Sequence, residues 1–241
     1  MKRLAWGLAG LFALLAVLLA SAALLATTAS GFRWLTKAAA VLSNEQLKFE
    51  GVDGHLGAPL GIRKLTIATD MQRIEIEGLR LEWQPRALWQ RRIEVDLLAA
   101  QTLRVNVLKK DLTPPEIPAS LRLPLDLRVQ VIDLARLDMI DAGQTLSFRN
   151  LRARLDGTGA NYRLTGLTLE SPWADVSGEF EVGKDAPFAL QGRIDAARRD
   201  PLPLTARLEL KGALAALQFR LDAAADGMTL LASGEAAPFA K

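Results

Sequence analysis

Two hydrophobic patterns divide this chain. Residues 4–32 carry no charged side chain, and a helix over residues 4–28 would be about 37 Å long at the helical rise. That length exceeds the roughly 30 Å hydrocarbon core of a bilayer. From Leu47 onward, apolar and polar residues alternate with a period of two, which is typical of half-buried strands. The pattern predicts a transmembrane anchor over residues 1–30 and a mostly β region over residues 47–241.

The anchor has a predicted orientation. Lys2 and Arg3 precede the apolar run, and positive flanks stay in the cytoplasm. We therefore expect a single-pass protein of the bacterial inner membrane, with residues 4–28 in the bilayer and the bulk in the periplasm. A cleavable signal peptide is the alternative, because residues 20–22 read Ala-Ser-Ala, but the apolar run is longer than the roughly 7–15 residues of a signal sequence. Residues 31–46 are expected to form a juxtamembrane helix, which either continues the anchor or lies at the membrane surface.

The alternation predicts which side chains lie together. Apolar positions of successive strands are expected to share one concave face, with charged neighbours on the other face. The predicted members of this face are Ile74, Ile76, Leu81, Val95, Leu97, Val129, Val131, Phe180, Val182, Leu190, Ile194, Leu208, Leu210, Phe219 and Leu221.

Interruptions of the pattern predict turns and bulges. The alternation slips at Gly78 and at Gly166, where a β-bulge would return the apolar residues to one face. Four prolines within residues 109–124 predict a loop that divides the sheet signal. Short turn segments elsewhere predict antiparallel neighbours. Periodicity alone does not distinguish an open, curved sheet from a closed sandwich, because both produce the same alternation.

The chemistry of the chain argues against catalysis. His55 is the only histidine, and the chain has no cysteine, so a His-rich or thiolate metal site is not expected. No nucleophile elbow, phosphate-binding loop or dinucleotide fingerprint is present. The net charge of +3 falls to +1 without Lys2 and Arg3, and basic residues form no patch of the kind that binds nucleic acid. We expect no enzyme activity, no metal and no cofactor.

One segment has a more specific sequence pattern than the alternation of apolar and polar residues. Residues 79–95 read LRLEWQPRALWQRRIEV, in which a strand ends at Trp83, Pro85 opens a short helical turn with Leu88 and Trp89, and a new strand starts at Ile93. With the anchor, the turn at 52–57 and the strand at 62–67, this segment resembles the N-terminal region of TamB-like proteins, within the wider AsmA-like group of envelope proteins. The segments 171–180 and 234–240 are similar to that family too, while Arg91 and Arg92 stand where a turn with glycine is expected.

The resemblance implies an elongated, curved, mainly antiparallel sheet of the β-taco type, anchored in the inner membrane. Such proteins are similar to bridge-like lipid carriers, in which acyl chains of phospholipid slide along an apolar trough between the inner and outer membranes. TamB-like members also work with an outer-membrane assembly protein of the Omp85 type, the TamA-like partner. Because family members are far longer, the chain is expected to be a fragment.

Three functions stay open at this level. The first is a phospholipid conduit whose groove is the apolar face. The second is a scaffold or chaperone for outer-membrane protein assembly, which would pair its strand edges with a barrel. An anchored envelope enzyme is the third, and the absence of catalytic motifs makes it the weakest.

Overall fold

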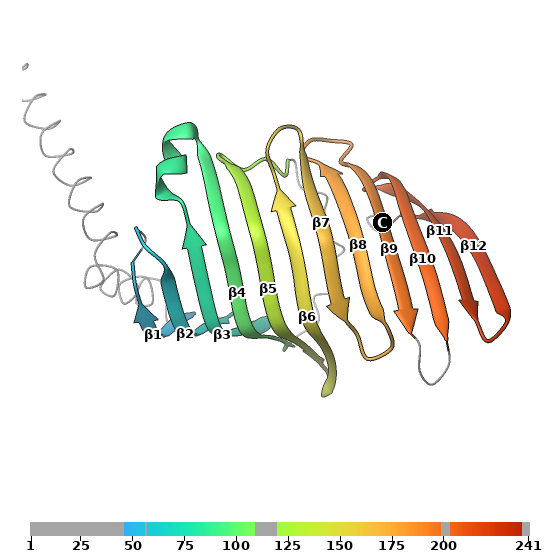
Figure 1. The fold of residues 1–241 in the computed structure, drawn as a ribbon, viewed down its shortest axis with the longest axis horizontal. Coiled ribbons are helices and arrows are strands. Elements are labelled where there is room, and N and C mark those ends of the chain that lie inside the picture. Colours follow the sequence, from blue (N-terminus) through green and yellow to red (C-terminus); the bar gives the residue numbers. More distant parts are fainter. Residues whose placement is uncertain (1–45, 56, 109–119, 199–202, 238–241) are drawn as a thin grey trace, which may run out of the picture.

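A computed structural model describes residues 46–55, 57–108, 120–198 and 203–237. These residues form one twelve-stranded sheet in which spatial order follows chain order, with one short 3₁₀ helix (Figure 1). The elements are β1 (Leu47–Asp53), β2 (Leu60–Ala68), β3 (Gln72–Trp83), η1 (Pro85–Gln90), β4 (Arg92–Val107), β5 (Asp126–Asp141), β6 (Gln144–Asp156), β7 (Asn161–Glu170), β8 (Asp175–Gly183), β9 (Ala189–Arg198), β10 (Leu204–Ala213), β11 (Ala216–Ala225) and β12 (Met228–Ala236).

Nearly all neighbouring strands are antiparallel, but β4 and β5 are parallel. The sheet is therefore mainly antiparallel, as expected, and the pair of β4 and β5 is the exception among the described strands. A two-residue turn joins only antiparallel strands, whereas a parallel pair needs a crossover of about a dozen residues or more. The proline-rich connection between Val107 and Asp126 is long enough to return the chain to the end at which β4 begins.

The strands β8 to β11 keep the alternation that the sequence predicts. Ile194, Leu208 and Leu221 are paired across β9, β10 and β11, and the next residues along form the pairs of Arg193 with Glu209 and of Glu209 with Arg220. Since paired residues share a face of the sheet, one face is a set of apolar rows and the other a set of charged rows.

In β1 to β6 the alternation slips along one line. Ile76 pairs with Leu65 and Leu79 with Ile62, so each strand has two residues between its apolar positions instead of one. The corresponding pairs of residues that face away from the apolar side are Glu50 and Gly51, Arg63 and Lys64, Glu77 and Gly78, Gln101 and Thr102, Ala135 and Arg136, and Arg149 and Asn150. We call this line the crease.

The crease leaves the register intact because every strand from β1 to β6 carries the same extra residue. Gly51, Gly78 and Asn150 have φ of 61°, 64° and 52°, the left-handed backbone that a bulge uses. The extra residue first becomes visible as a register shift between β6 and β7, at Arg149 and Arg152. Gly166 makes a separate bulge, which shifts the register between Leu164 and Leu167. The predicted bulge at Gly166 is confirmed, and at Gly78 the neighbouring strands absorb it.

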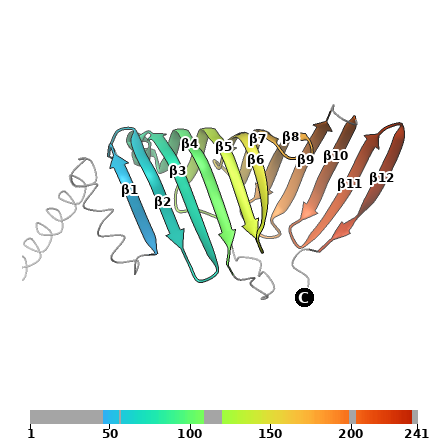
Figure 2. The same cartoon turned by 90° about the horizontal axis from the view of Figure 1, so that it is seen from below.

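The sheet is open and curved. No second sheet or long helix covers it within the described residues, and Figure 2 shows the strands following one another along a bent, elongated surface. An extra residue lengthens the charged side of each strand, so the sheet bends toward the apolar side. The open arrangement, and not the closed sandwich, is the one observed.

Because the sheet is open, few of its side chains are buried. Within the described part of the chain ten apolar residues are buried, among them Val95, Val129 and Phe188, and no large side chain there is completely enclosed. Phe188 is 2% exposed in the turn between β8 and β9, where its carbonyl accepts a hydrogen bond from the Leu214 backbone N–H at 3.1 Å. Most apolar residues of the sheet are half-buried, which is the expected state of an uncovered face.

The predicted anchor, the juxtamembrane helix and most of the proline-rich loop lie outside the described residues. Among the residues that the structure describes, no helix has the length and apolar character to cross a membrane.

Candidate functional site

The apolar face is most regular in β8 to β11. Phe180, Val182, Leu190, Ile194, Leu208, Leu210, Phe219 and Leu221 all belong to its rows, as the pairing shows. Each phenylalanine is paired with a glycine of the next strand: Phe180 with Gly192, and Phe219 with Gly234. A Cβ on Gly192 would lie 2.5 Å from the Phe180 ring. The rings therefore lie across the neighbouring strand and make a continuous apolar surface.

The face continues through β2 to β5 on both sides of the crease. Ile74 pairs with Ile67 and Val105, and Ile76 with Leu65 and Leu103. Beyond the crease, Leu81 pairs with Leu60 and Leu98, and Val95 pairs with Trp83 and Val129. Thirteen of the fifteen predicted residues thus belong to apolar rows of one face; the two exceptions are Leu97 and Val131.

Leu97 and Val131 do not lie on the apolar face, contrary to the prediction. Leu97 pairs with Glu82, and the register shifts between Glu82 and Trp83, so Leu97 lies on the face opposite to Val95. In β5 the register shifts between Val129 and Ile132 and leaves Val131 outside the apolar row, with 41% of its surface exposed. One additional residue in each strand reverses the side-chain direction. Simple alternation from Val95 and Val129 does not reveal it.

The opposite face carries a network of ion pairs. Glu75 lies 3.3 Å from Lys64 and 3.5 Å from Arg104 (side-chain N to O). Asp195 lies 2.7 Å from both Arg193 and Arg207, and their hydrogen bonds lower the pKa of its carboxyl. These rows keep the charged face solvated and leave the apolar face without competing charges.

Asp138 is the buried member of this network, with 3% of its surface exposed. Burial by itself would raise its pKa, but hydrogen bonds from Ser147 and Arg136, together with the charge of Arg104, lower the pKa below its ordinary value. Its carboxylate accepts from Ser147 Oγ at 2.7 Å and from Arg136 Nε at 2.9 Å. The charge is therefore held in place by three neighbouring strands.

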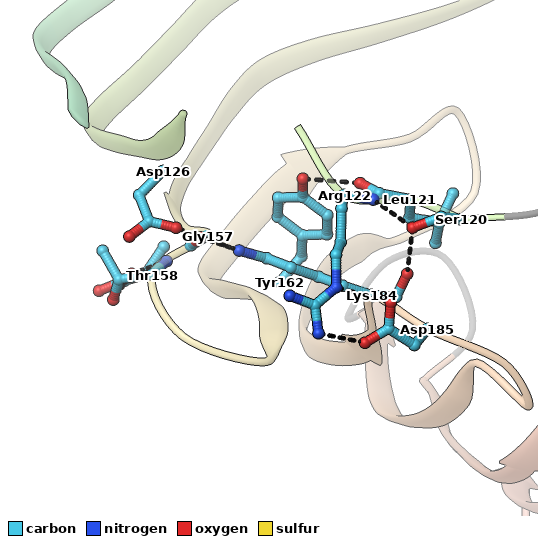
Figure 3. A network of polar contacts seen from close by, with 10 residues as sticks. Ser120, Leu121, Arg122, Asp126, Gly157, Thr158, Tyr162, Lys184 and Asp185 are labelled. Atoms are coloured by element: carbon cyan, nitrogen blue, oxygen red, sulfur yellow. Dashed lines mark hydrogen bonds and ion pairs between the residues drawn. The ribbon is translucent and has the colours of Figure 1, made fainter. Parts of the chain in front are cut away.

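A clasp joins the end of the proline-rich connection to β7 and β8 (Figure 3). At its centre is Lys184, which is 5% exposed and lies over the Tyr162 ring with Nζ 4.8 Å from the centroid. Lys184 Nζ donates to the Gly157 carbonyl and lies 3.4 Å from Asp126 Oδ1. An ammonium buried in this way is stabilised by a carbonyl, a carboxylate and an aromatic face together.

The second half of the clasp ties the connection itself. The Leu121 backbone N–H donates to the Lys184 carbonyl at 2.9 Å, and Tyr162 Oη donates to the Leu121 carbonyl at 2.8 Å. Arg122 Nε donates to Asp185 Oδ1 at 2.7 Å, and this contact lowers the pKa of the Asp185 carboxyl. Because Tyr162 pairs with Val182 in an apolar row, the clasp lies at the rim of the apolar face.

Reasoning from the sequence did not find the clasp. Lys184 lies in a turn rich in Gly, Asp and Pro, a composition that is typical of a solvated loop. Its burial depends on Tyr162 and Asp126, which are distant in the chain. The isolated tyrosine of a chain with a single Tyr was the one available signal.

The described residues hold no group of three or more His, Cys, Asp or Glu side chains with the geometry of a metal site. The surface that the fold builds is instead an extended apolar face, bordered by a charged face and a polar clasp.

Comparison with known protein families gives a match in the N-terminal half of the chain. Residues 18–120 match the family model described as TamB, N-terminal domain. Comparison with curated proteins finds no match, and none is found among solved structures. The matched range contains β1 to β4, η1 and the segment 79–95. Residues 18–120 of this chain are therefore similar to the N-terminal domain of TamB.

Proposed function

We propose that this chain is part of a phospholipid conduit of the bacterial envelope, anchored in the inner membrane by residues 4–28. The observation that carries the proposal is the apolar face, which runs over twelve consecutive strands and is not covered by a second layer among the described residues. Acyl chains would lie along this face while head groups stay in water. No bond is made or broken, and no catalytic residue, metal or cofactor is needed.

The dimensions suit this role. Strands are spaced by about 4.8 Å, so twelve of them span roughly 50 Å across the sheet, more than the roughly 30 Å of a bilayer core. An acyl chain moving from strand to strand would pass along the apolar rows, over Leu, Val, Ile and Phe side chains. Such a surface favours apolar ligands and makes few hydrogen-bonding demands.

The proposal is tested by site-specific photo-crosslinking in the intact protein. A photoreactive residue at Phe180 or Leu208, both on the apolar face, should capture phospholipid. The matched controls are Glu179 and Glu209, their neighbours on the charged face, which should give little or no lipid adduct. Equal labelling of the two faces, or no lipid adduct from folded protein at Phe180 and Leu208, would refute the conduit.

The edge strand β12 of the described sheet supports a second proposal. β12 pairs only with β11 within the described residues, and its Leu230 and Leu231 are 57% and 72% exposed. An exposed edge strand is a template for strand addition, as a scaffold for outer-membrane proteins with an Omp85-type, TamA-like partner would require. A crosslinker at Leu231 should then capture a barrel protein, and capture of lipid alone at that position would count against the scaffold.

A further inference from the structure

The helix η1 projects at one end of the strands, between β3 and β4 (Figure 1). Ala87 is 7% exposed and fixes the helix to the strands, while the Gln84 backbone N–H donates to the Glu94 carbonyl at 2.8 Å. At its other end, the Arg91 backbone N–H donates to the Leu88 carbonyl at 2.9 Å. The backbone of η1 is therefore held against the strands, and little backbone conformational entropy would be lost if η1 bound a surface.

Two large apolar side chains of η1 are exposed. Trp89 is 91% exposed and Leu88 41% exposed. A tryptophan contributes a large apolar surface with one hydrogen-bond donor, which suits the boundary between water and hydrocarbon. The sheet itself makes no use of this side chain.

The same projection is positively charged. Arg86 and Arg91 are exposed, neither forms an ion pair within the described part of the chain, and residues 83–93 contain no acidic side chain. Arg91 has φ of 57°, a left-handed conformation in which glycine is favoured and a side chain is strained. An arginine is thus present at a position whose backbone geometry prefers glycine.

We propose that η1 docks on an anionic phospholipid bilayer, with Trp89 and Leu88 in the interfacial layer and Arg86 and Arg91 at the phosphates. Basic residues beside an exposed aromatic group are the chemistry that anionic membrane surfaces recognise. A protein partner is a poorer fit, since stable protein interfaces bury about 800 Å² on each side and η1 has only six residues. The docking site does not depend on lipid passing along the apolar face.

The test uses the full chain in vesicles and a local readout. The chain has no cysteine, so Gln90→Cys provides a single site for a nitroxide label beside an intact Trp89. The control label is Trp173→Cys, at an aromatic residue that is 57% exposed in the turn between β7 and β8, at the opposite end of the strands (Figure 1). Both labelled proteins are placed in phosphatidylcholine vesicles with and without phosphatidylglycerol.

In vesicles with phosphatidylglycerol, the label at position 90 should gain collisions with oxygen and lose collisions with a water-soluble nickel chelate, while the label at position 173 should not change. Trp89→Ala should abolish the difference. Arg91→Gly, which suits the backbone, and Arg86→Gln should each weaken docking about fivefold. Equal accessibility at the two positions, or no dependence on phosphatidylglycerol, would overturn the docking site. Crosslinking of lipid at Phe180 would be unaffected by that failure, so the two proposals are separable.

Discussion

At the scale of the residue, position on one face or the other determines what a side chain does. Phe180 lies against Gly192 and completes the apolar surface, whereas Glu179, one residue earlier, belongs to the charged rows. Asp138 and Lys184 show the same dependence for buried charges, since each is surrounded by several partners. A charge buried to the same extent without such partners would strongly destabilise the folded protein.

The lowered pKa of Asp138 predicts that the protein becomes less stable at acidic pH. Its pKa is lowered in the folded state, so its contribution is present above the unfolded pKa of about 4 and is lost as pH falls through the lower folded value. Asp138→Asn should reduce the free energy of unfolding by about 1–3 kcal/mol at pH 7, and by less at low pH. Denaturant unfolding of the full chain in detergent at both pH values measures this.

The control for Asp138 is Asp175→Asn, because Asp175 is exposed and forms no ion pair within the described residues. This variant should differ little from the parent protein at either pH. If Asp138→Asn were as stable as Asp175→Asn at pH 7, the buried carboxylate would not contribute as described.

At the scale of the element, the crease bends the part of the sheet that β1 to β6 form. Its repeated extra residue keeps Ile76 and Leu81 on a common face although five positions separate them. The parallel pair of β4 and β5 lies within this part of the sheet. The clasp holds the end of the proline-rich connection between these two strands against β8. Bend and crossover are therefore stabilised by different contacts.

The crease predicts a position-dependent effect of glycine substitution. Gly78→Ala should lower the free energy of unfolding by about 1–2 kcal/mol, because a left-handed backbone is strained for alanine and the Cβ would approach the Gln101 side chain to 2.6 Å. Gly61→Ala is the control in the adjacent strand, where nothing lies closer than 4.0 Å to the added Cβ. Denaturant midpoints compare the two variants, and equal stability would contradict the role of Gly78.

At the scale of the whole molecule, the proposed conduit requires an uninterrupted apolar path. Phe180→Glu would place a charge on that path, so an acyl chain would have to pass an unpaired carboxylate and transfer should fall at least tenfold. Val131→Glu is the matched variant, since Val131 lies off the apolar row and is exposed; it should transfer lipid at nearly the parent rate. Transfer of a fluorescent phospholipid by the full chain measures both, after circular dichroism shows that each variant is folded. Equal loss in the two variants would contradict the path.

The sequence by itself determined the elements. Period-two alternation predicted the β region, its slip predicted the Gly166 bulge, and Pro85 predicted the short turn with Leu88 and Trp89, because these features depend on residues that are close along the chain. Tertiary structure alone decided the parallel pairing of β4 with β5, the crease that six strands share, the faces of Leu97 and Val131, and the burial of Lys184. Each of these depends on which strand lies alongside and on whether that strand carries a matching extra residue. Alternation within one strand does not contain that information.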